Sequence, residues 1–340
     1  MASGAYVLGS LAKMLLAYID SRNLVLPVLQ ANLLKRTPTE QIPIEYWWEW
    51  LEVVQQADFR PAVGVHIGRH AKPHHMGLLG YLLLSCDDGT QALDYFQRFQ
   101  PLLHSLSPSS IYRHNDRLRI NWDYSFGTST QISSEVLVSA FLTNTKNFVG
   151  DKEVIVYSVS FPGSPPSNSD QYDDILGCPV EFSAKTLGLE LQAKWLDEKI
   201  PTADSDLRQV LELHADSLME VTPRPDPFLK ALEINILRAI PQGDVSASAI
   251  ANILDMPLRS FYRRLDQRSI NYRHFLQTLR YQLAKQYLGN SQLELAEISQ
   301  LLGYSEQSAF GRAFKQWHGA TPNRYRRLIE LERSRPQRES

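Results

Sequence analysis

Residues 293–326 read LELAEISQLLGYSEQSAFGRAFKQWHGATPNRYR, and this stretch decides the fold of the last third of the chain. Just ahead of it, Ser291 and Glu294 form the S-x-x-E pattern of a capping box, which predicts the start of a helix with apolar residues at helical spacing. Gly303 permits the positive φ that a tight turn between helices requires. A second helix is expected over Ser305–Trp317. Two helices joined in this way form a helix-turn-helix, whose second helix fits the major groove of DNA.

A similar pair of helices is predicted over Val245–Arg268. Ser246 caps its first helix, and Leu258–Gln267 forms its second. Between the two pairs, Tyr272–Leu288 reads as one linker helix of about 25 Å at 1.5 Å per residue. A spacer of this length sets two recognition helices roughly one DNA turn, about 34 Å, apart. One chain could then read two adjacent segments of the major groove without dimerising.

The charged residues are divided unequally along the chain, although their total of 35 Lys plus Arg and 37 Asp plus Glu gives a net charge of only −2. Up to Pro225 there are 18 basic and 26 acidic residues, and from Asp226 onward there are 17 and 11. Fourteen of those 17 basic residues are Arg, which pairs with phosphate and guanine in bidentate geometry. This balance favours a nucleic-acid-binding end; a solvated basic face without a partner is the alternative.

Three prolines at alternate positions, 223, 225 and 227, mark a boundary, because they forbid a continuous helix. We expect an effector or dimerisation domain over 1–222, a proline-rich linker over 223–228, a DNA-binding domain over 229–330 and a basic tail over 331–340. The fold class expected is an α+β N-terminal domain followed by an all-α C-terminal domain, with two helix-turn-helix motifs joined by the linker helix.

Helical and strand patterns alternate in the first domain. Helices are expected over Glu45–Ala57, Thr90–Leu103 and Leu207–Met219. Strands are expected in a hairpin over Ile111–Tyr124, turning at Asn115-Asp116, and at Glu153–Phe161 and Cys178–Phe182.

The residues of the second helix-turn-helix carry a family resemblance. The pattern Ile298-Ser299-x-Leu301-Leu302-Gly303-Tyr304-Ser305-x-x-Ser308-x-Phe310-x-Arg312-Ala313-Phe314-Lys315, continued by Gly319-x-Thr321-Pro322, resembles the signature of the AraC/XylS family of bacterial transcription regulators. The first recognition helix and the linker helix fit the same family. The resemblance implies double-stranded DNA as a partner, with RNA polymerase and a second copy of the chain as further ones, and activation rather than repression.

Carried over by position, the DNA-binding candidates lie on the two recognition helices. They are Arg259, Ser260, Arg263 and Arg264 in the first and Gln307, Ser308, Arg312 and Lys315 in the second. Arg can pair with guanine O6 and N7, and Gln with adenine N6 and N7. Phosphate contact or helix packing is the expectation for Arg264, Arg280, Lys315, Arg324 and Arg326, and Arg312 could instead pair with an upstream acid. Met256 stands where family members often have Ser, and it cannot accept an N-cap hydrogen bond.

The first domain resembles the effector domain of an AraC-type subgroup that includes the ornithine-utilisation regulator. The matching stretches include Val63-Gly64-Val65-x-Ile67-Gly68, Gly77-Leu78-Leu79-Gly80-Tyr81-Leu82 and Leu176-Gly177-Cys178-Pro179-Val180. The resemblance implies a small-molecule or dimerisation domain of mixed α and β structure, different from the arabinose-binding cupin barrel.

An apolar pocket with a few polar anchors is the usual form of a ligand site, and the first domain is rich in aromatic residues. The candidate effector-binding residues are Arg69, Tyr81, Arg98, Arg113 and Trp122, with the three arginines as anchors for a carboxylate. A fatty acid-like molecule and an amino-acid-derived metabolite are the rival effectors. A domain that only dimerises or contacts another protein, without a ligand, is the second hypothesis.

Several other functions are excluded or disfavoured by the sequence. No G-x-S-x-G, G-x-x-x-x-G-K-[ST] or H-E-x-x-H motif is present, so no enzyme is expected. No cofactor or metal is expected either, because Pro73 interrupts the spacing of His66, His70, His74 and His75. Cys86 and Cys178 could in principle form a redox switch, but neither lies in a C-x-x-C pattern. The absence of a leader or a long apolar run predicts a soluble cytoplasmic protein with no membrane partner.

Overall fold

The computed structural model describes residues 5–105, 109–122, 129–150, 153–222, 226–268, 270–289 and 293–327, without the side chains of Lys230 and Gln286. The chain divides into two compact units, a first unit that ends at residue 225 and a second unit that begins at Asp226. Ser291, Tyr124, the linker residues 223–225 and the expected tail over 331–340 lie outside the described residues.

The first unit mixes helices and strands, as its sequence predicts. Its strands are β1 (Tyr6–Leu8), β2 (Gln41–Pro43), β3 (Ser109–His114), β4 (Arg117–Trp122), β5 (Val156–Ser160), β6 (Val180–Glu181) and β7 (Leu187–Gln192). Its α-helices are α1 (Ser10–Ser21), α2 (Pro27–Leu34), α3 (Ile44–Ala57), α4 (Val63–Gly68), α5 (Leu78–Leu84), α6 (Gly89–Phe99), α7 (Gln131–Val149), α8 (Tyr172–Leu176) and α9 (Ser205–Val221). Short 3₁₀ turns are η1 (Pro73–Met76), η2 (Gln100–Leu102), η3 (Ser169–Gln171) and η4 (Ala193–Asp197).

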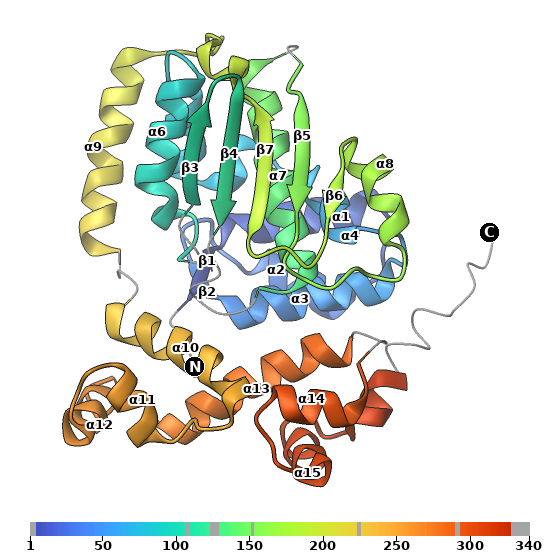
Figure 1. Ribbon diagram of the computed structural model, residues 1–340. Helices are drawn as coiled ribbons and strands as arrows, with labels where there is room; N and C mark the ends of the chain where they lie inside the picture. Colours follow the sequence, from blue (N-terminus) through green and yellow to red (C-terminus); the bar gives the residue numbers. More distant parts are fainter. Residues whose placement is uncertain are drawn as a thin grey trace. The chain divides into compact units, whose positions relative to one another are not determined.

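Five strands form an open sheet in the order β3-β4-β7-β5-β6, antiparallel except for the parallel pair β5–β6. The expected hairpin is confirmed: β3 pairs with β4 in the register Ile111↔Ile120, and Asn115 takes a φ of 53° in the turn. Leu118, Ile120 and Trp122 alternate with more exposed residues along β4, so this strand turns one face to the core. Figure 1 shows the sheet with α7 behind it.

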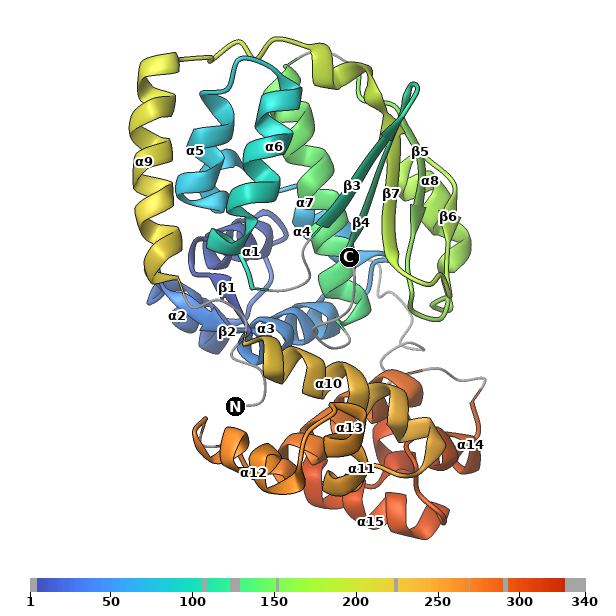
Figure 2. The same ribbon diagram turned by 60° about the vertical axis from the view of Figure 1, so that its left-hand side comes forward.

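Helix α7 lies between the sheet and the helices α5 and α6 of the first unit (Figure 2). Its residues Val138, Leu142 and Val149 share a core with the sheet. On its other side lie α5 and α6, with α9 outermost (Figure 2). The expected helix over 90–103 ends earlier, at Phe99, because Pro101 has no N–H to continue the α-helical hydrogen bonds, and a 3₁₀ turn follows.

Two glycines let α4 approach α7 closely. A Cβ atom on Gly64 would lie 2.3 Å from the carbonyl oxygen of Ile132 and 2.6 Å from Glu135 Cβ. A Cβ atom on Gly68 would lie 2.6 Å from Ser139 Cβ. All three distances are far shorter than a van der Waals contact, so larger residues would push the helices apart.

This close approach buries the carboxyl group of Glu135. Burial raises the pKa of Glu135 to about 7, against hydrogen bonds that lower it. The Tyr172 hydroxyl donates to Oε1 at 2.6 Å, and the Gly64 N–H donates to Oε2 at 3.0 Å. Gln131 Nε2 also donates to Oε1, at 3.1 Å. Desolvation therefore outweighs three donors to the carboxylate.

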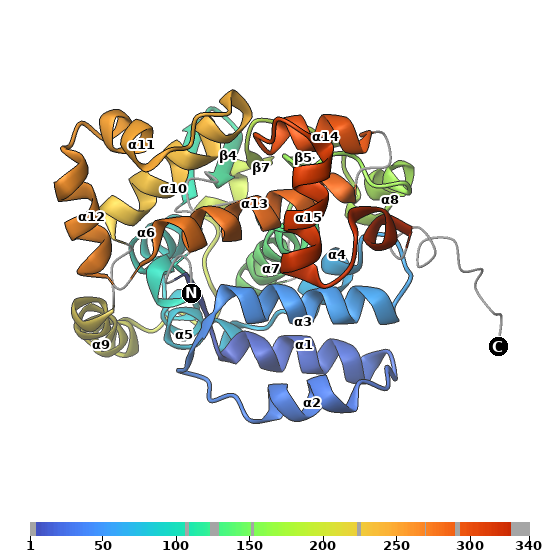
Figure 3. The ribbon, with the colours of Figure 1, turned by 90° about the horizontal axis from the view of Figure 1, so that it is seen from below.

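The second unit is helical throughout its described residues. It consists of α10 (Pro227–Ala239), η5 (Ile240–Gln242), α11 (Ala247–Ile253), α12 (Leu258–Asp266), α13 (Tyr272–Leu288), α14 (Leu295–Leu301) and α15 (Gln307–His318). Helix α13 runs between the α11–α12 pair and the α14–α15 pair (Figure 3), and one apolar core joins all six helices. The sequence-predicted fold class, including the linker helix, is confirmed.

Two details of the second unit differ from expectation. Helix α14 begins at Leu295, so Glu294 is its N-cap, and the capping box pairs Glu294 with Glu297, whose Oε2 accepts from the Glu294 N–H at 2.8 Å. The segment expected as an extended linker also contains the start of a helix, because Pro227 fits the first turn of α10 and Asp226 caps it.

The turn at Gly303 follows the sequence prediction and shows why no other residue fits. Its φ is +70°, and a Cβ atom there would lie 2.4 Å from the carbonyl oxygen of Ile240. Gly303 therefore serves both the turn into α15 and the contact with η5.

We predict that Gly64→Ala destabilises the first unit by about 1–3 kcal/mol, because the methyl group overpacks the α4–α7 contact. The matched control is Gly311→Ala in α15, where a Cβ atom meets nothing within 4 Å. That change should stabilise the second unit by roughly 0.5–1 kcal/mol, since alanine loses less backbone entropy. Hydrogen exchange of α7 and α15 amides under urea measures both. Equal effects of the two substitutions would contradict the close-packing argument.

A second prediction concerns pH. A raised folded-state pKa means that Glu135 favours folding below its unfolded pKa near 4.5, and that this stability is lost as pH rises toward about 7. Glu135→Gln stays neutral and should lack this loss, which is on the order of 3 kcal/mol at about 1.4 kcal/mol per unit. Urea unfolding at pH 5 and pH 8, followed by tryptophan fluorescence, tests it, because five of the six tryptophans lie in the first unit. Identical pH slopes in the two proteins would refute it.

Candidate nucleic-acid interface and ligand cavity

Helix α12 presents two arginines on one exposed face. Arg259 and Arg263 are four residues apart and solvent-exposed, and Ser260 between them is half-buried. Phe261 and Leu265 fill the core on the opposite side of the helix. Because Phe261 and Leu265 are buried, the two arginines on the opposite face of the helix point toward solvent.

The start of α12 shows how Met256 is accommodated at a position where family members often have Ser. The N-cap is Pro257, which makes no side-chain cap, and Met256 packs against the core. Asp255, with a φ of 51°, turns the chain ahead of it. A hydroxyl at position 256 would therefore stand one residue before the N-cap, and apolar packing takes its place here.

Arg264 is exposed, but its guanidinium group packs within the second unit. Arg264 Cζ lies 5.5 Å from the centre of the Phe228 ring, and Arg268 Cζ lies 5.2 Å from the centre of the same ring. Arg268 Nε also bonds the carboxylate of Asp226. These contacts favour the packing interpretation of Arg264.

Helix α15 repeats the arrangement. The predicted DNA-binding residues Gln307, Ser308, Arg312 and Lys315 are all exposed. Phe310 and Phe314 are fully buried on its other side. In the described part of the chain, no hydrogen bond or ion pair engages the Arg312 side chain, so the expected alternative of pairing with an upstream acid finds no support there.

An exposed carboxylate at the start of α15 was missed by sequence reasoning. Glu306 is the N-cap, and its Oε2 accepts a hydrogen bond from the Ser308 hydroxyl at 3.1 Å. A carboxylate in this position can accept from the N4 amino group of cytosine. Nothing in the sequence pattern distinguishes Glu306 from a glutamate that is simply exposed to solvent.

Two other arginines expected at phosphates or in packing are half-buried and bond backbone carbonyl groups. Arg280 donates to the carbonyl oxygen of Gly303 at 3.4 Å and stacks over the Tyr304 ring at 4.7 Å. Arg326 donates to the carbonyl oxygen of Leu293 at 2.8 Å. Both brace the second helix-turn-helix, whereas Arg324 is exposed.

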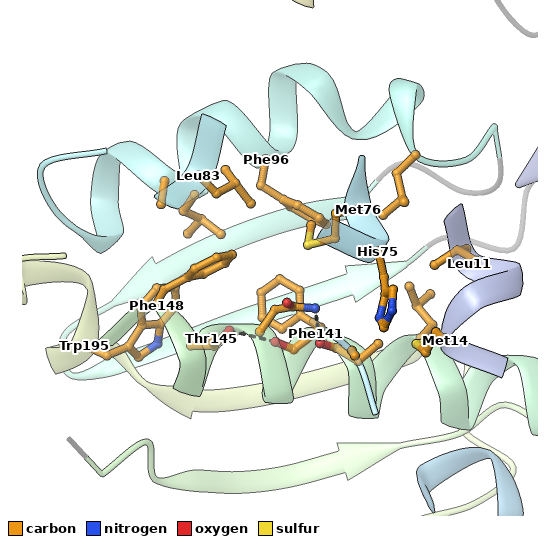
Figure 4. A pocket seen from close by; sticks show the side chains of 17 residues that line it. Leu11, Met14, His75, Met76, Leu83, Phe96, Phe141, Thr145, Phe148 and Trp195 are labelled. Atoms are coloured by element: carbon orange, nitrogen blue, oxygen red, sulfur yellow. Dashed lines mark hydrogen bonds between the residues drawn. The ribbon is translucent and has the colours of Figure 1, made fainter. Parts of the chain in front are cut away.

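The first unit encloses an apolar cavity (Figure 4). It is lined by residues from α1, η1, α5, α6, α7 and η4, and its volume is about 70 Å³. Figure 4 shows Trp195 and Phe148 at one end and Leu11 and Met14 at the other, with Phe96, Met76 and Phe141 between them. An apolar cavity with a few polar groups is the usual form of a small-molecule site.

Three polar residues of the lining, besides Trp195, are His75, Asn144 and Thr145. Burial lowers the pKa of His75 to about 4, so the imidazole is neutral at pH 7. Its Nδ1 accepts from the Lys72 N–H at 3.1 Å. Thr145 donates back to the carbonyl oxygen of Phe141 at 2.9 Å, as hydroxyls in helices commonly do.

The five sequence-predicted effector residues lie elsewhere, and none of them lines this cavity. Arg69 bonds the carbonyl oxygen of Ile175, Arg98 pairs with Glu212 and Asp216, and Arg113 pairs with Asp197. Tyr81 is half exposed on α5. Trp122 is buried in the sheet, with its ring centre 5.8 Å from that of Phe141, a cavity residue. The structure therefore does not gather these five residues into one site.

The histidines and cysteines show no sign of a reactive site in the described residues. No three His, Cys, Asp or Glu side chains come together there as metal ligands would. Burial raises the pKa of Cys86 to about 12 and that of Cys178 to about 11, and the two lie in different apolar cores. Among the same residues, no helix is both long and apolar enough to cross a membrane.

Each of the two units contains a stretch that matches the model of a known protein family. The model of the arabinose-binding domain of AraC transcription regulators, N-terminal, matches residues 29–200, and a helix-turn-helix domain model matches residues 250–328. The ornithine utilization regulator of Pseudomonas aeruginosa is 26% identical over 78% of this chain and 78% of its own length. The regulator VirS of Mycobacterium tuberculosis is 33% identical over 46% of this chain and 45% of its own.

A solved structure, that of the transcriptional regulator CdpR from Pseudomonas aeruginosa, aligns over 93% of this chain and 97% of its own, with 22% identity and a TM-score of 0.46. The relatives are named as transcription regulators and not as enzymes. The first family model alone spans just over half of the 340 residues. The chain therefore belongs to the AraC family of transcription regulators, as a DNA-binding regulator with an arabinose-binding-like N-terminal domain.

Proposed function

We propose that this protein is an effector-controlled activator that reads two adjacent major-groove segments with α12 and α15. The observation that carries the proposal is the pair of exposed recognition helices, whose cationic side chains Arg259, Arg263, Arg312 and Lys315 have no acidic partner among the described residues. Cationic side chains that are exposed on a helix with a buried opposite face can contact DNA phosphates and the edges of bases.

The DNA-binding residues predicted from the sequence have the following roles under this proposal. Arg259, Arg263 and Arg312 pair with guanine, and Gln307 pairs with adenine. Ser260 and Ser308 make shorter-range hydrogen bonds to the DNA, and Lys315 neutralises a phosphate. Arg264 packs on the Phe228 ring and supports the helix from within the second unit. The 17 residues of α13 set the separation of the two helices.

Under this proposal, each of the two units has its own role. Residues 1–222 bind the effector, and 223–228 connect them to the DNA-binding domain over 229–330, followed by a basic tail over 331–340. Effector binding shifts the population of conformations and so changes DNA affinity. The protein acts in the cytoplasm, where it contacts RNA polymerase and a second copy of itself. These partners rest on the family relationship.

We expect Arg263→Ala and Arg312→Ala each to weaken specific DNA binding by about 1–3 kcal/mol and to relax base preference at the position read. Lys315→Ala should instead weaken binding to all sequences equally and reduce the salt dependence by about one counterion. Binding is measured on duplexes that the wild-type protein selects from a random pool. Arg119→Ala, on the sheet of the first unit, is the control and should bind like wild type.

Wild-type affinity and base preference in both recognition-helix variants would disprove the assignment of reading residues.

The alternative of a ligand-independent regulator has its own test. A thermal-shift screen of metabolites on the whole chain should find a compound that raises the melting temperature, because binding to the folded state stabilises it. The same compound should change DNA affinity. A screen without such a compound favours a first unit that serves dimerisation or protein contact.

A further inference from the structure

Two large apolar side chains are exposed on the recognition helix α12. Leu258 is 42% exposed and Tyr262 is 45% exposed. They lie four residues apart, so they are neighbours on the helix surface and form an apolar row. Among the described residues of the second unit, the one other exposed large apolar side chain is Ile253, at the end of α11. Single exposed apolar residues are normal on a protein surface, whereas this row presents a continuous apolar strip.

The apolar row adjoins the cationic row of the same helix. Arg259 follows Leu258 and Arg263 follows Tyr262, so each arginine lies about 100° around the helix from its apolar neighbour. The ring of Tyr262 meets that of Phe261 edge to face, with 5.8 Å between the ring centres, and Phe261 is fixed in the core. A surface with an apolar row beside a cationic row suits a partner that is anionic and carries apolar groups.

Comparison of the two recognition helices supports DNA as this partner. Phe261 of α12 and Phe310 of α15 are both fully buried and hold their helices on the shared core. Three positions before these phenylalanines stand Leu258 in α12 and Gln307 in α15. Gln307 is exposed and is a predicted DNA-binding residue. The same position on α12 therefore faces DNA under the proposed function, and it carries an apolar side chain in place of an amide.

The major groove offers one apolar group on the base edges, the C5-methyl group of thymine. Cytosine lacks this methyl group, and so does uracil. Phosphates and guanine edges supply the anionic and accepting partners that arginine requires. The two rows of α12 thus match the two kinds of group that a thymine-containing duplex presents in this groove.

We propose that Leu258 and Tyr262 read thymine by packing against its C5-methyl group, beside the bases that Arg259 and Arg263 contact. This inference rests on the proposed function, because it requires α12 to lie in the major groove. The contact removes apolar surface from water, so its contribution is hydrophobic. It therefore adds base selectivity without adding to the salt dependence that the cationic side chains cause.

Replacing thymine with deoxyuridine tests the contact, because the two bases pair with adenine in the same way and differ by that methyl group. The whole chain is titrated with a duplex that the wild-type protein selects from a random pool. The thymines replaced lie next to the base pair whose preference Arg263→Ala relaxes. Each methyl group removed should weaken binding about fourfold, the effect of exposing one such group to water. Equal binding of the thymine and uracil duplexes, or no thymine selected at these positions, would overturn the proposal.

Variants of exposed residues assign the methyl effect to the apolar row. The double variant Leu258→Ala/Tyr262→Ala should bind the thymine and uracil duplexes equally, with a melting temperature close to that of the wild type because the buried core is unchanged. Tyr262→Phe keeps the ring and should keep the wild-type ratio of the two affinities. The matched control is Ile253→Ala, which removes an exposed apolar side chain from α11, a helix that does not enter the groove in this motif.

The control should also keep the wild-type ratio of the two affinities. A wild-type ratio in the double variant, or loss of the ratio in Ile253→Ala, would refute the assigned contact.

This inference and the proposed function fail in different ways. Weakened DNA binding by Arg263→Ala, together with equal binding of the thymine and uracil duplexes by wild type, would overturn the thymine contact alone. Wild-type DNA affinity in Arg263→Ala and Arg312→Ala would instead contradict the proposed function. Self-association of the free chain in sedimentation, abolished in the double variant without any thymine effect, would assign the apolar row to a second copy and overturn the inference.

Discussion

The first unit depends on the packing of α7, which is in contact with a different environment on each side. Its apolar residues meet the sheet, its carboxylate at Glu135 meets the glycine face of α4, and Phe141 and Phe148 are among its residues that line the cavity. A helix in such a position cannot move against one neighbour without disturbing the others, because the interior is densely packed. A ligand in the cavity and the fold of the sheet are thus linked through one element.

In the second unit a shared core has the corresponding role. Phe261 of α12 and Phe310 of α15 belong to the same apolar cluster as the linker helix α13. The two recognition helices therefore share one apolar core. A shared core restricts the separation at which they present their arginines, as the proposed reading of two segments of one DNA duplex requires.

The sequence predicted the second unit closely and the cavity not at all, for physical reasons. Caps, a turn glycine and helical periodicity are local signals, so α13 was placed at its observed bounds, Tyr272–Leu288. The cavity is assembled from segments as distant as Leu11 and Trp195. Asn144 and Thr145, which also line it, lie in a polar run over residues 143–147 that carries no hydrophobic signal, and both are buried. The arginines chosen as anchors found acidic or carbonyl partners that no periodicity reveals.

The contacts around Phe228 have a mechanical consequence. Asp226, the residue at which the second unit begins, accepts from the N–H groups of Phe228 and Leu229 and also binds Arg268, just beyond the end of α12. Arg264 of α12 itself lies on the same phenylalanine ring. The first turn of α10 and the last turn of α12 are therefore clamped together at the point where the chain enters the unit. A displacement of Asp226 would therefore be transmitted to α12 through one carboxylate and through the Phe228 ring, which is itself part of the core of the second unit.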